Sequence, residues 1–140
     1  MVSSFMKWVL RFLMMAAMVT QLTSCIFEGT NEKLTGRYRL SATDIDIQMH
    51  VSYELESGNT IGRIPETVFS VGWNNRYIVA KQHPKNDRTV TNYFYLEMAR
   101  DNKYADPSAS VTGPLSADEF EKKKTKLGLP PFSRTIEKLK

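Results

Sequence analysis

The sequence predicts an α+β fold in which an antiparallel meander sheet of about five strands has one C-terminal amphipathic helix packed on one face. Three observations predict it: a long alternation of apolar and polar residues over 45–55, further apolar runs separated by turn residues, and a helix-start signal at Ser116. Strands that follow one another without intervening helices favour antiparallel pairing, and a helix after them can cover one sheet face. A length of 140 residues fits one such domain.

The first strand is expected over 36–40, and the second has the strongest signal in the chain. In this second strand the odd positions are all apolar, namely Ile45, Ile47, Met49, Val51, Tyr53 and Leu55. Such period-two alternation predicts a strand with one buried and one solvated face. Because the run exceeds the usual strand length, we expect a bend or bulge within it.

Three more strands are expected over 68–73, 76–82 and 90–98. Asn74 and Asn75 separate the first two, and asparagine tolerates the positive φ of a two-residue hairpin turn. Residues 101–114 are expected to form a long loop, because two prolines and a glycine interrupt regular structure there.

The helix is expected to begin after Ser116, an N-cap residue that forms a capping box with Glu119. Gly128 then ends the helix, and the prolines that follow cannot continue it. A turn or a docking strand is expected over 132–140. The four lysines within 122–126 are compatible with a solvated helix face or with contact to anionic lipid.

Residues 1–24 are predicted to be a signal peptide. Lys7 and Arg11 precede a short apolar run over 12–19, which is too short to cross a bilayer because a span takes about 20 apolar residues. These two residues belong to the excess of 19 Lys and Arg over 15 Asp and Glu, so the rest of the chain is close to neutral. It contains no basic run of the kind that binds nucleic acid, and no nucleic-acid partner is expected.

The residues Leu22-Thr23-Ser24-Cys25 resemble the lipobox of bacterial lipoproteins. The resemblance implies cleavage before Cys25 and a covalent lipid on Cys25, so the membrane is a partner through acyl chains and no other cofactor is expected. Cys25 is the only cysteine, and acylation would account for its lack of a disulfide partner. The alternative is a plain secretory signal followed by an incidental cysteine.

The lipobox sets the expected domain boundaries. Residues 25–35 are expected to be the acylated cysteine and a tether, and residues 36–140 one globular domain. By the sorting rule of Gram-negative lipoproteins, Ile26 in place of Asp implies an anchor on the extracytoplasmic side, in the outer membrane and facing the periplasm.

Two stretches of the predicted domain resemble a family of small bacterial lipoproteins of unknown function. They are Gly72-Trp73-Asn74-Asn75-Arg76-Tyr77-Ile78-Val79-Ala80-Lys81-Gln82-His83-Pro84, and Val111-Thr112-Gly113-Pro114-Leu115 followed by Glu119-Phe120 and Leu127-Gly128-Leu129-Pro130. The resemblance covers roughly residues 36–130. It concerns a hairpin and a capped helix, so it implies a fold and supplies no catalytic residue.

Catalytic and metal sites are not expected. A nucleophile needs a base and an orienting group within reach, and the domain offers two histidines and no serine in a nucleophile-elbow motif. Asp46 and His50 would lie ~13 Å apart on one strand face, too far to share an ion. We therefore predict no enzyme activity, no catalytic residue and no metal ligand.

The candidate partner interface is the solvated sheet face, with Asp44, Asp46 and His50 on one strand and Tyr93 and Tyr95 on another. The tyrosines have the opposite parity from the apolar residues of their strand, and their hydroxyl groups favour exposure. A solvated face without a partner is the alternative for these residues.

These features predict a non-catalytic binding or inhibitory module on an extracytoplasmic membrane surface. Its most concrete form is an immunity or inhibitor protein against a periplasmic toxic enzyme, such as a lipase or a wall hydrolase. The alternative is a structural or assembly lipoprotein of the cell envelope or of a secretion apparatus. Neighbouring genes for a toxic effector or for envelope assembly would discriminate between the two.

Overall fold

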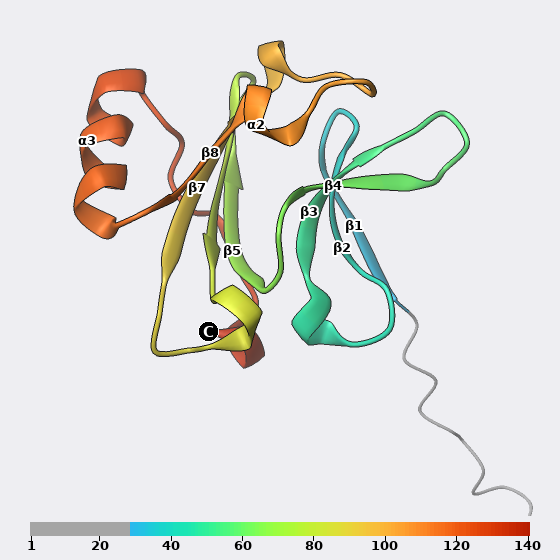
Figure 1. Cartoon of the computed structure of the whole chain (residues 1–140), viewed down its shortest axis with the longest axis horizontal. Coiled ribbons are helices and arrows are strands. Elements are labelled where there is room, and N and C mark those ends of the chain that lie inside the picture. Colours follow the sequence, from blue (N-terminus) through green and yellow to red (C-terminus); the bar gives the residue numbers. More distant parts are fainter. Residues whose placement is uncertain (1–28) are drawn as a thin grey trace, which may run out of the picture.

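The computed structural model describes residues 29–140, so the predicted signal peptide and Cys25 lie outside the described residues. The described chain forms two antiparallel sheets of four and five strands, with few helices (Figure 1). The α+β class is therefore broadly confirmed. The prediction of a single meander sheet is wrong, because the chain leaves the first sheet after its fourth strand and builds a second one.

The first sheet has the order β1-β2-β3-β4. Its strands are β1 Thr30–Thr35, β2 Tyr38–Ala42, β3 His50–Glu54 and β4 Thr60–Ile64. β1 occupies residues that were predicted to be tether, because it pairs along β2 and buries Leu34 in the core. Residues 30–35, which were predicted to belong to the tether, are therefore part of the first sheet.

The predicted alternating run is interrupted, as the expected bend or bulge requires, and its strand β3 is shorter than the run. Its first part forms the 3-10 helix η1, Asp46–Gln48, and β3 begins only after it. The side-chain oxygen Oε1 of Gln48 accepts a hydrogen bond from the backbone N–H of Asp44 at 2.9 Å. This local side-chain bond closes a turn where alternation alone predicted extended backbone. Ile45 and Ile47 are consequently 49% and 40% exposed.

The second sheet has the order β8-β7-β6-β5-β9. Three of its strands, β5 Val68–Trp73, β6 Tyr77–Gln82 and β7 Asn92–Glu97, confirm the three strands predicted for this part of the chain. The predicted hairpin between β5 and β6 occurs, but without positive φ at Asn74 or Asn75. The turn is closed instead by the side chain of Asn74. Its Oδ1 accepts hydrogen bonds from the backbone N–H groups of Arg76 at 2.8 Å and Tyr77 at 2.7 Å.

The segment predicted as one long loop is more regular than expected. It contains the short helix α2, Pro107–Ser110, and the start of β8, Val111–Leu115, and the 3-10 helix η3, Met98–Arg100, directly precedes it. β8 pairs with β7 at the sheet edge, and its register shifts where Gly113 and Pro114 occur. An edge strand tolerates proline because one side of the strand needs no partner.

Helix α3, Ala117–Leu127, begins and ends as predicted. The Ser116 hydroxyl accepts the backbone N–H of Glu119 at 3.2 Å, and the Glu119 carboxylate accepts the backbone N–H of Ser116 at 2.8 Å. Gly128 ends the helix with φ +68°. Phe120 is its one buried residue, so its apolar face is narrow. α3 is not the last element, which corrects the prediction of a C-terminal helix.

The chain continues after α3 across the second sheet, and this confirms the predicted turn or docking strand. Strand β9, Arg134–Thr135, pairs with β5, and the 3-10 helix η4, Glu137–Leu139, follows it. A Cβ atom on Gly72 would lie 1.9 Å from the carbonyl oxygen of Pro131. Only glycine therefore permits this segment to cross β5 so closely.

Two apolar clusters hold three layers together. The larger cluster lies between the sheets and includes Leu40 and Val51 from the first sheet and Val71 and Leu96 from the second. The smaller cluster fills the space between the second sheet and α3, and comprises Tyr77, Val79, Tyr95, Phe120 and Leu129. Both faces of the second sheet are therefore buried, and this explains why every residue from Val68 to Gly72 is buried.

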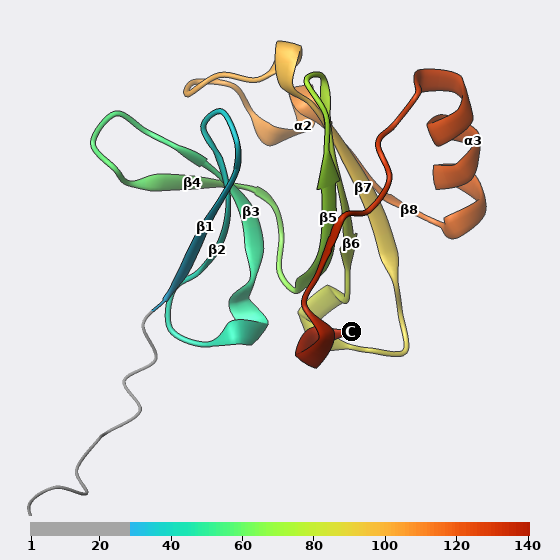
Figure 2. The same cartoon turned by 180° about the vertical axis from the view of Figure 1, so that it is seen from behind.

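The sandwich has two distinct ends, which Figures 1 and 2 show from opposite sides. The proximal end is where the described chain enters at Gly29, and it also carries η1, the 3-10 helix η2, Pro84–Asn86, and η4. The distal end carries the β1–β2 turn, the β5–β6 turn, and the distal loop, defined as residues 101–106.

Candidate functional site

The structure separates the five residues of the predicted partner interface. Asp44 and Asp46 lie in the connection between β2 and β3, and Asp46 forms an ion pair with Lys138 of η4. His50 begins β3, and its Nδ1 lies 2.9 Å from the carbonyl oxygen of Gln48. All three belong to the proximal half of the first sheet (Figure 1).

The two tyrosines lie on the second sheet under α3, so the prediction that they share a solvated face with His50 is wrong. Tyr95 is only 8% exposed. The ring of Tyr93 packs 5.1 Å from that of Phe120, centroid to centroid. The alternation of residues along β7 did not predict exposure correctly, because one face of β7 packs against the first sheet and the other against α3. Neither face is open to solvent.

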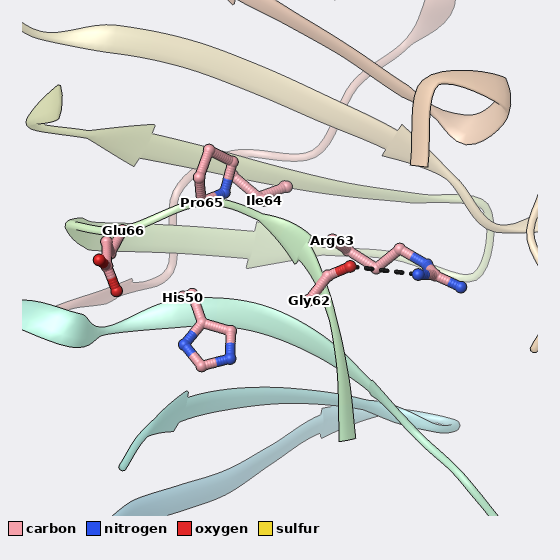
Figure 3. A pocket seen from close by; sticks show the side chains of 6 residues that line it. All are labelled: His50, Gly62, Arg63, Ile64, Pro65 and Glu66. Carbon is pink, nitrogen blue, oxygen red and sulfur yellow. Dashed lines mark hydrogen bonds between the residues drawn. The ribbon is translucent and has the colours of Figure 1, made fainter. Parts of the chain in front are cut away.

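His50 lies between two shallow hollows of the first sheet. One, of about 410 Å³, runs along β4 and is lined by His50, Gly62, Arg63, Ile64, Pro65 and Glu66 (Figure 3). The other, of about 450 Å³, lies between the β2–β3 connection and the β3–β4 hairpin. Figure 3 shows the Arg63 guanidinium turned away from His50 and toward the carbonyl of Gly62. Within residues 29–140, no three His, Cys, Asp or Glu side chains are grouped to hold a metal ion.

The most buried ion pair of the described residues belongs to a polar cluster that the sequence did not predict. Nε of Arg63 donates to both carboxylate oxygens of Asp101, at 3.0 and 2.8 Å. The two side chains are only 1% and 0% exposed. The other guanidinium nitrogens donate to the backbone carbonyls of Gly62 at 3.1 Å and Asn102 at 3.0 Å. The pair is thus saturated with partners, which a buried ion pair requires.

Two tyrosines complete this cluster. The hydroxyl of Tyr38 donates to Oδ2 of Asp101 at 2.9 Å. The guanidinium of Arg63 lies 5.5 Å from the ring centroid of Tyr53, in cation–π contact. Burial, reinforced by the hydrogen bond to the Asp101 carboxylate, raises the pKa of the Tyr38 hydroxyl far above its usual value of 10.0. Tyr38 therefore stays protonated and remains a hydrogen-bond donor.

The buried cluster fixes the distal loop to the sandwich. Asp101 begins the loop, and the backbone carbonyl of the next residue is held by Arg63. Within the loop, Oδ1 of Asn102 accepts the backbone N–H of Tyr104 at 2.9 Å, and Lys103 pairs with Glu56 of the β3–β4 hairpin at 3.3 Å. Asp106 then caps α2 through the backbone N–H of Ser108.

Tyr104 is the side chain that this loop presents. It is 86% exposed, the highest value among the large apolar side chains of the described residues. Both ends of its loop are fastened, by the Arg63–Asp101 pair and by α2. No pattern in the sequence distinguishes Tyr104, because the contact that positions its loop joins Arg63 to Asp101, 38 positions apart. What this arrangement can do chemically is offer an ordered aromatic group to another molecule.

Comparison with known proteins yields a family and no function. A family model described as "Protein of unknown function (DUF3997)" matches residues 35–133. No curated protein and no solved structure matches the chain. Within the described part of the chain, no helix is long and apolar enough to cross a membrane.

Proposed function

We propose, from the premise that the chain belongs to the DUF3997 family of unknown function, that it is a lipid-anchored extracytoplasmic protein that binds a protein partner without catalysing a reaction. The anchor is the lipid predicted on Cys25, and the binding site is the distal loop. In its most concrete form, the partner is a toxic enzyme of the periplasm, such as a lipase or a wall hydrolase, and this protein neutralises it.

One observation supports this proposal above the others: Tyr104 is nearly fully exposed on a loop that is fastened by a buried ion pair. Tyrosine is enriched among the residues that dominate binding energy at protein interfaces. A loop that is already ordered loses little conformational entropy when it binds, so more of the contact energy appears as affinity. Burying a charged pair to hold an exposed aromatic group favours a binding role for that group.

The location of the distal loop fits a partner that approaches from the periplasm. The loop is at the end of the sandwich opposite Gly29, where the chain from the predicted anchor enters (Figure 2). A strand of six residues is about 20 Å long. The sandwich would therefore hold Tyr104 away from the membrane surface and toward molecules that arrive from outside.

The test is capture of the partner by the native acylated protein from detergent-solubilised membranes, followed by a functional assay. Tyr104→Ala is compared with Lys126→Ala, which changes an exposed residue of α3. We expect Tyr104→Ala to weaken binding by about 2 kcal/mol or more, and Lys126→Ala to have little effect. Equal capture by both variants would show that the distal loop is not the binding site.

The identity of the partner separates the two functional classes. If the partner is a toxic enzyme, the purified protein should inhibit it stoichiometrically, with full inhibition at a fixed molar ratio. Co-expression should then protect cells only when the protein is exported, so residues 26–140 expressed without a leader should not protect. Recovery of envelope-assembly proteins and no inhibition would instead support the structural or assembly role. If amounts of this protein below the molar amount of the toxic enzyme inactivate it progressively with time, this protein would be an enzyme.

A further inference from the structure

The proximal end concentrates the exposed apolar side chains of the described chain. Besides Tyr104, the large apolar side chains that are exposed are Ile45, Ile47 and Val90, at 49%, 40% and 41%. Ile45 directly precedes η1 and Ile47 lies within it, and together with Lys85 they line a hollow of about 290 Å³. Val90 lies in the connection between η2 and β7, also at this end (Figure 1). These three residues define the proximal face.

The elements that carry the proximal face are fastened to one another. The hydroxyl of Thr67 donates to the backbone carbonyl of Ile47, and Asp46 pairs with Lys138 of η4. Arg88, two residues before Val90, donates to the backbone carbonyl of Lys138 at 2.8 Å. The three apolar side chains are therefore presented on an ordered surface, although exposing apolar surface to water is unfavourable.

The chain connects this end closely to the predicted lipid. Gly29 lies against the backbone of Ala42 and Thr43, just before η1. Cys25 is four residues earlier in the sequence. Four residues span at most about 14 Å even when fully extended. With acyl chains of Cys25 in a bilayer, the proximal end must therefore lie at the level of the lipid headgroups.

We propose that the proximal face rests on the bilayer surface, with Ile45, Ile47 and Val90 inserted among the lipid headgroups. This inference rests on the proposed lipid anchor at Cys25, and it adds the orientation of the domain. Charge is nearly balanced at this end, where Lys138 is paired with Asp46. The other charged side chains of these elements are the acidic Asp44, Glu66, Asp87 and Glu137 and the basic Lys85, Arg88 and Lys140. The contact is therefore apolar, and zwitterionic phospholipid is sufficient for it.

Thiol accessibility tests the orientation directly. Because lipid occupies the sulfur of Cys25, the only cysteine, any introduced cysteine is the only free thiol. Acylated Ile47→Cys and Tyr104→Cys proteins are reconstituted into vesicles of phosphatidylcholine, with and without phosphatidylglycerol. The rate of labelling by a water-soluble maleimide is then measured. The same two variants of residues 26–140, which carry no lipid, provide the rates in the absence of a membrane.

We expect vesicles to slow the labelling of Ile47→Cys at least tenfold and to leave Tyr104→Cys unchanged, equally with both lipid compositions. If vesicles do not slow the labelling of Ile47→Cys although its mass confirms the lipid, the proposed orientation is wrong and the proposed anchor still stands. A mass without lipid on Cys25 would overturn the anchor and the orientation together. Protection only in anionic vesicles would contradict an apolar contact. Concentration-dependent protection without vesicles would assign the face to a second copy of the chain.

Discussion

At the scale of single residues, the Arg63–Asp101 pair links stability to the proposed binding site. An ion pair removed from water contributes little net stability when complete, yet removing one partner leaves an uncompensated buried charge. The same pair positions the loop that carries Tyr104. A residue far from the exposed surface should therefore affect both unfolding and binding.

We expect Asp101→Asn to lower the free energy of unfolding by about 3–5 kcal/mol, because Arg63 would lose its counter-charge in a site that excludes water. The matched control is Glu54→Gln, which breaks the partly exposed Arg39–Glu54 pair and should change stability by about 1 kcal/mol or less. Denaturant unfolding of both variants gives the comparison. Similar losses would mean that the Arg63–Asp101 pair is solvated in solution.

Tyr38 gives a pH-dependent prediction at the same scale. Its pKa is raised in the folded protein, mainly by burial and then by the hydrogen bond to Asp101. In the unfolded chain it would titrate near pH 10. Its contribution to stability is therefore complete below about pH 10 and decreases as the pH rises toward the folded-state pKa. Tyr38→Phe should remove this part of the alkaline destabilisation, as measured by unfolding at several pH values.

At the scale of elements, local signals predicted structure wherever side chain and backbone interact over a few residues. The capping box of Ser116 and Glu119, the hairpin turn after β5 and the stop at Gly128 were all predicted and all occur, although the side chain of Asn74 closes the turn in place of the expected positive φ. Their physical cause lies within four residues of sequence, so one chain suffices to identify it. Strand boundaries were predicted less accurately. The side chain of Gln48 closes a turn within a stretch whose apolar and polar residues alternate as in a strand, so two local signals conflict there.

The site residues were predicted less well because their environment is set by distant elements. Tyr93 and Tyr95 looked exposed by parity, but the helix that covers them begins more than 20 positions later. The Arg63–Asp101 pair was missed for the same reason, since nothing near either residue in sequence indicates its partner. Periodicity identifies a face of a strand, but it does not reveal how many faces the fold will cover.

The helix cap provides a prediction for α3. Ser116→Ala should lower stability by about 1 kcal/mol, because the backbone N–H of Glu119 loses its acceptor. Ser133→Ala, at an exposed position in the segment before β9, is the control and should be nearly neutral. Thermal or denaturant unfolding measures both. An equal effect of the two changes would indicate that the cap is frayed in solution.

The charge of Glu119 makes the same cap sensitive to acid. The hydrogen bond from the backbone N–H of Ser116, and then the contact with its hydroxyl, lower the pKa of Glu119. A lowered folded-state pKa means that the stabilisation is present above the ordinary glutamate value and is lost as the pH falls through the folded value. Glu119→Gln keeps an acceptor without the charge, so its stability should depend less on pH in this acidic range.

Packing of the helix layer can be tested separately. Phe120→Ala should lower stability by about 3–5 kcal/mol, because Phe120 is the buried residue of α3 and contacts Tyr93. Leu127→Ala, at a partly buried position of the same helix, should have a smaller effect. Denaturant unfolding gives both values. A small effect of Phe120→Ala would mean that the second cluster is loosely packed in solution.

At the scale of the whole molecule, the proposals place two activities at opposite ends of one sandwich. The proximal face would contact lipid, and the distal loop would contact a protein, with the core between the sheets connecting them rigidly. Membrane contact and partner affinity should therefore depend on different residues. Changes at Ile47 should alter membrane contact without altering partner affinity, and changes at Tyr104 should do the reverse.

The anchor on Cys25 underlies this arrangement, and its prediction is the most direct to test. Cys25→Ala should abolish incorporation of a palmitate analogue, because the alanine side chain has no sulfur to accept the lipid. The precursor should remain uncleaved, or the domain should be released from its acyl anchor. Tyr104→Ala serves as the control, since a change in the distal loop should leave the label intact. Equal labelling of wild type and Cys25→Ala would show that the lipid, if any, is attached elsewhere. The orientation proposed for Ile45, Ile47 and Val90 would then lose its geometric basis, because the short connection to Gly29 would no longer begin in the membrane.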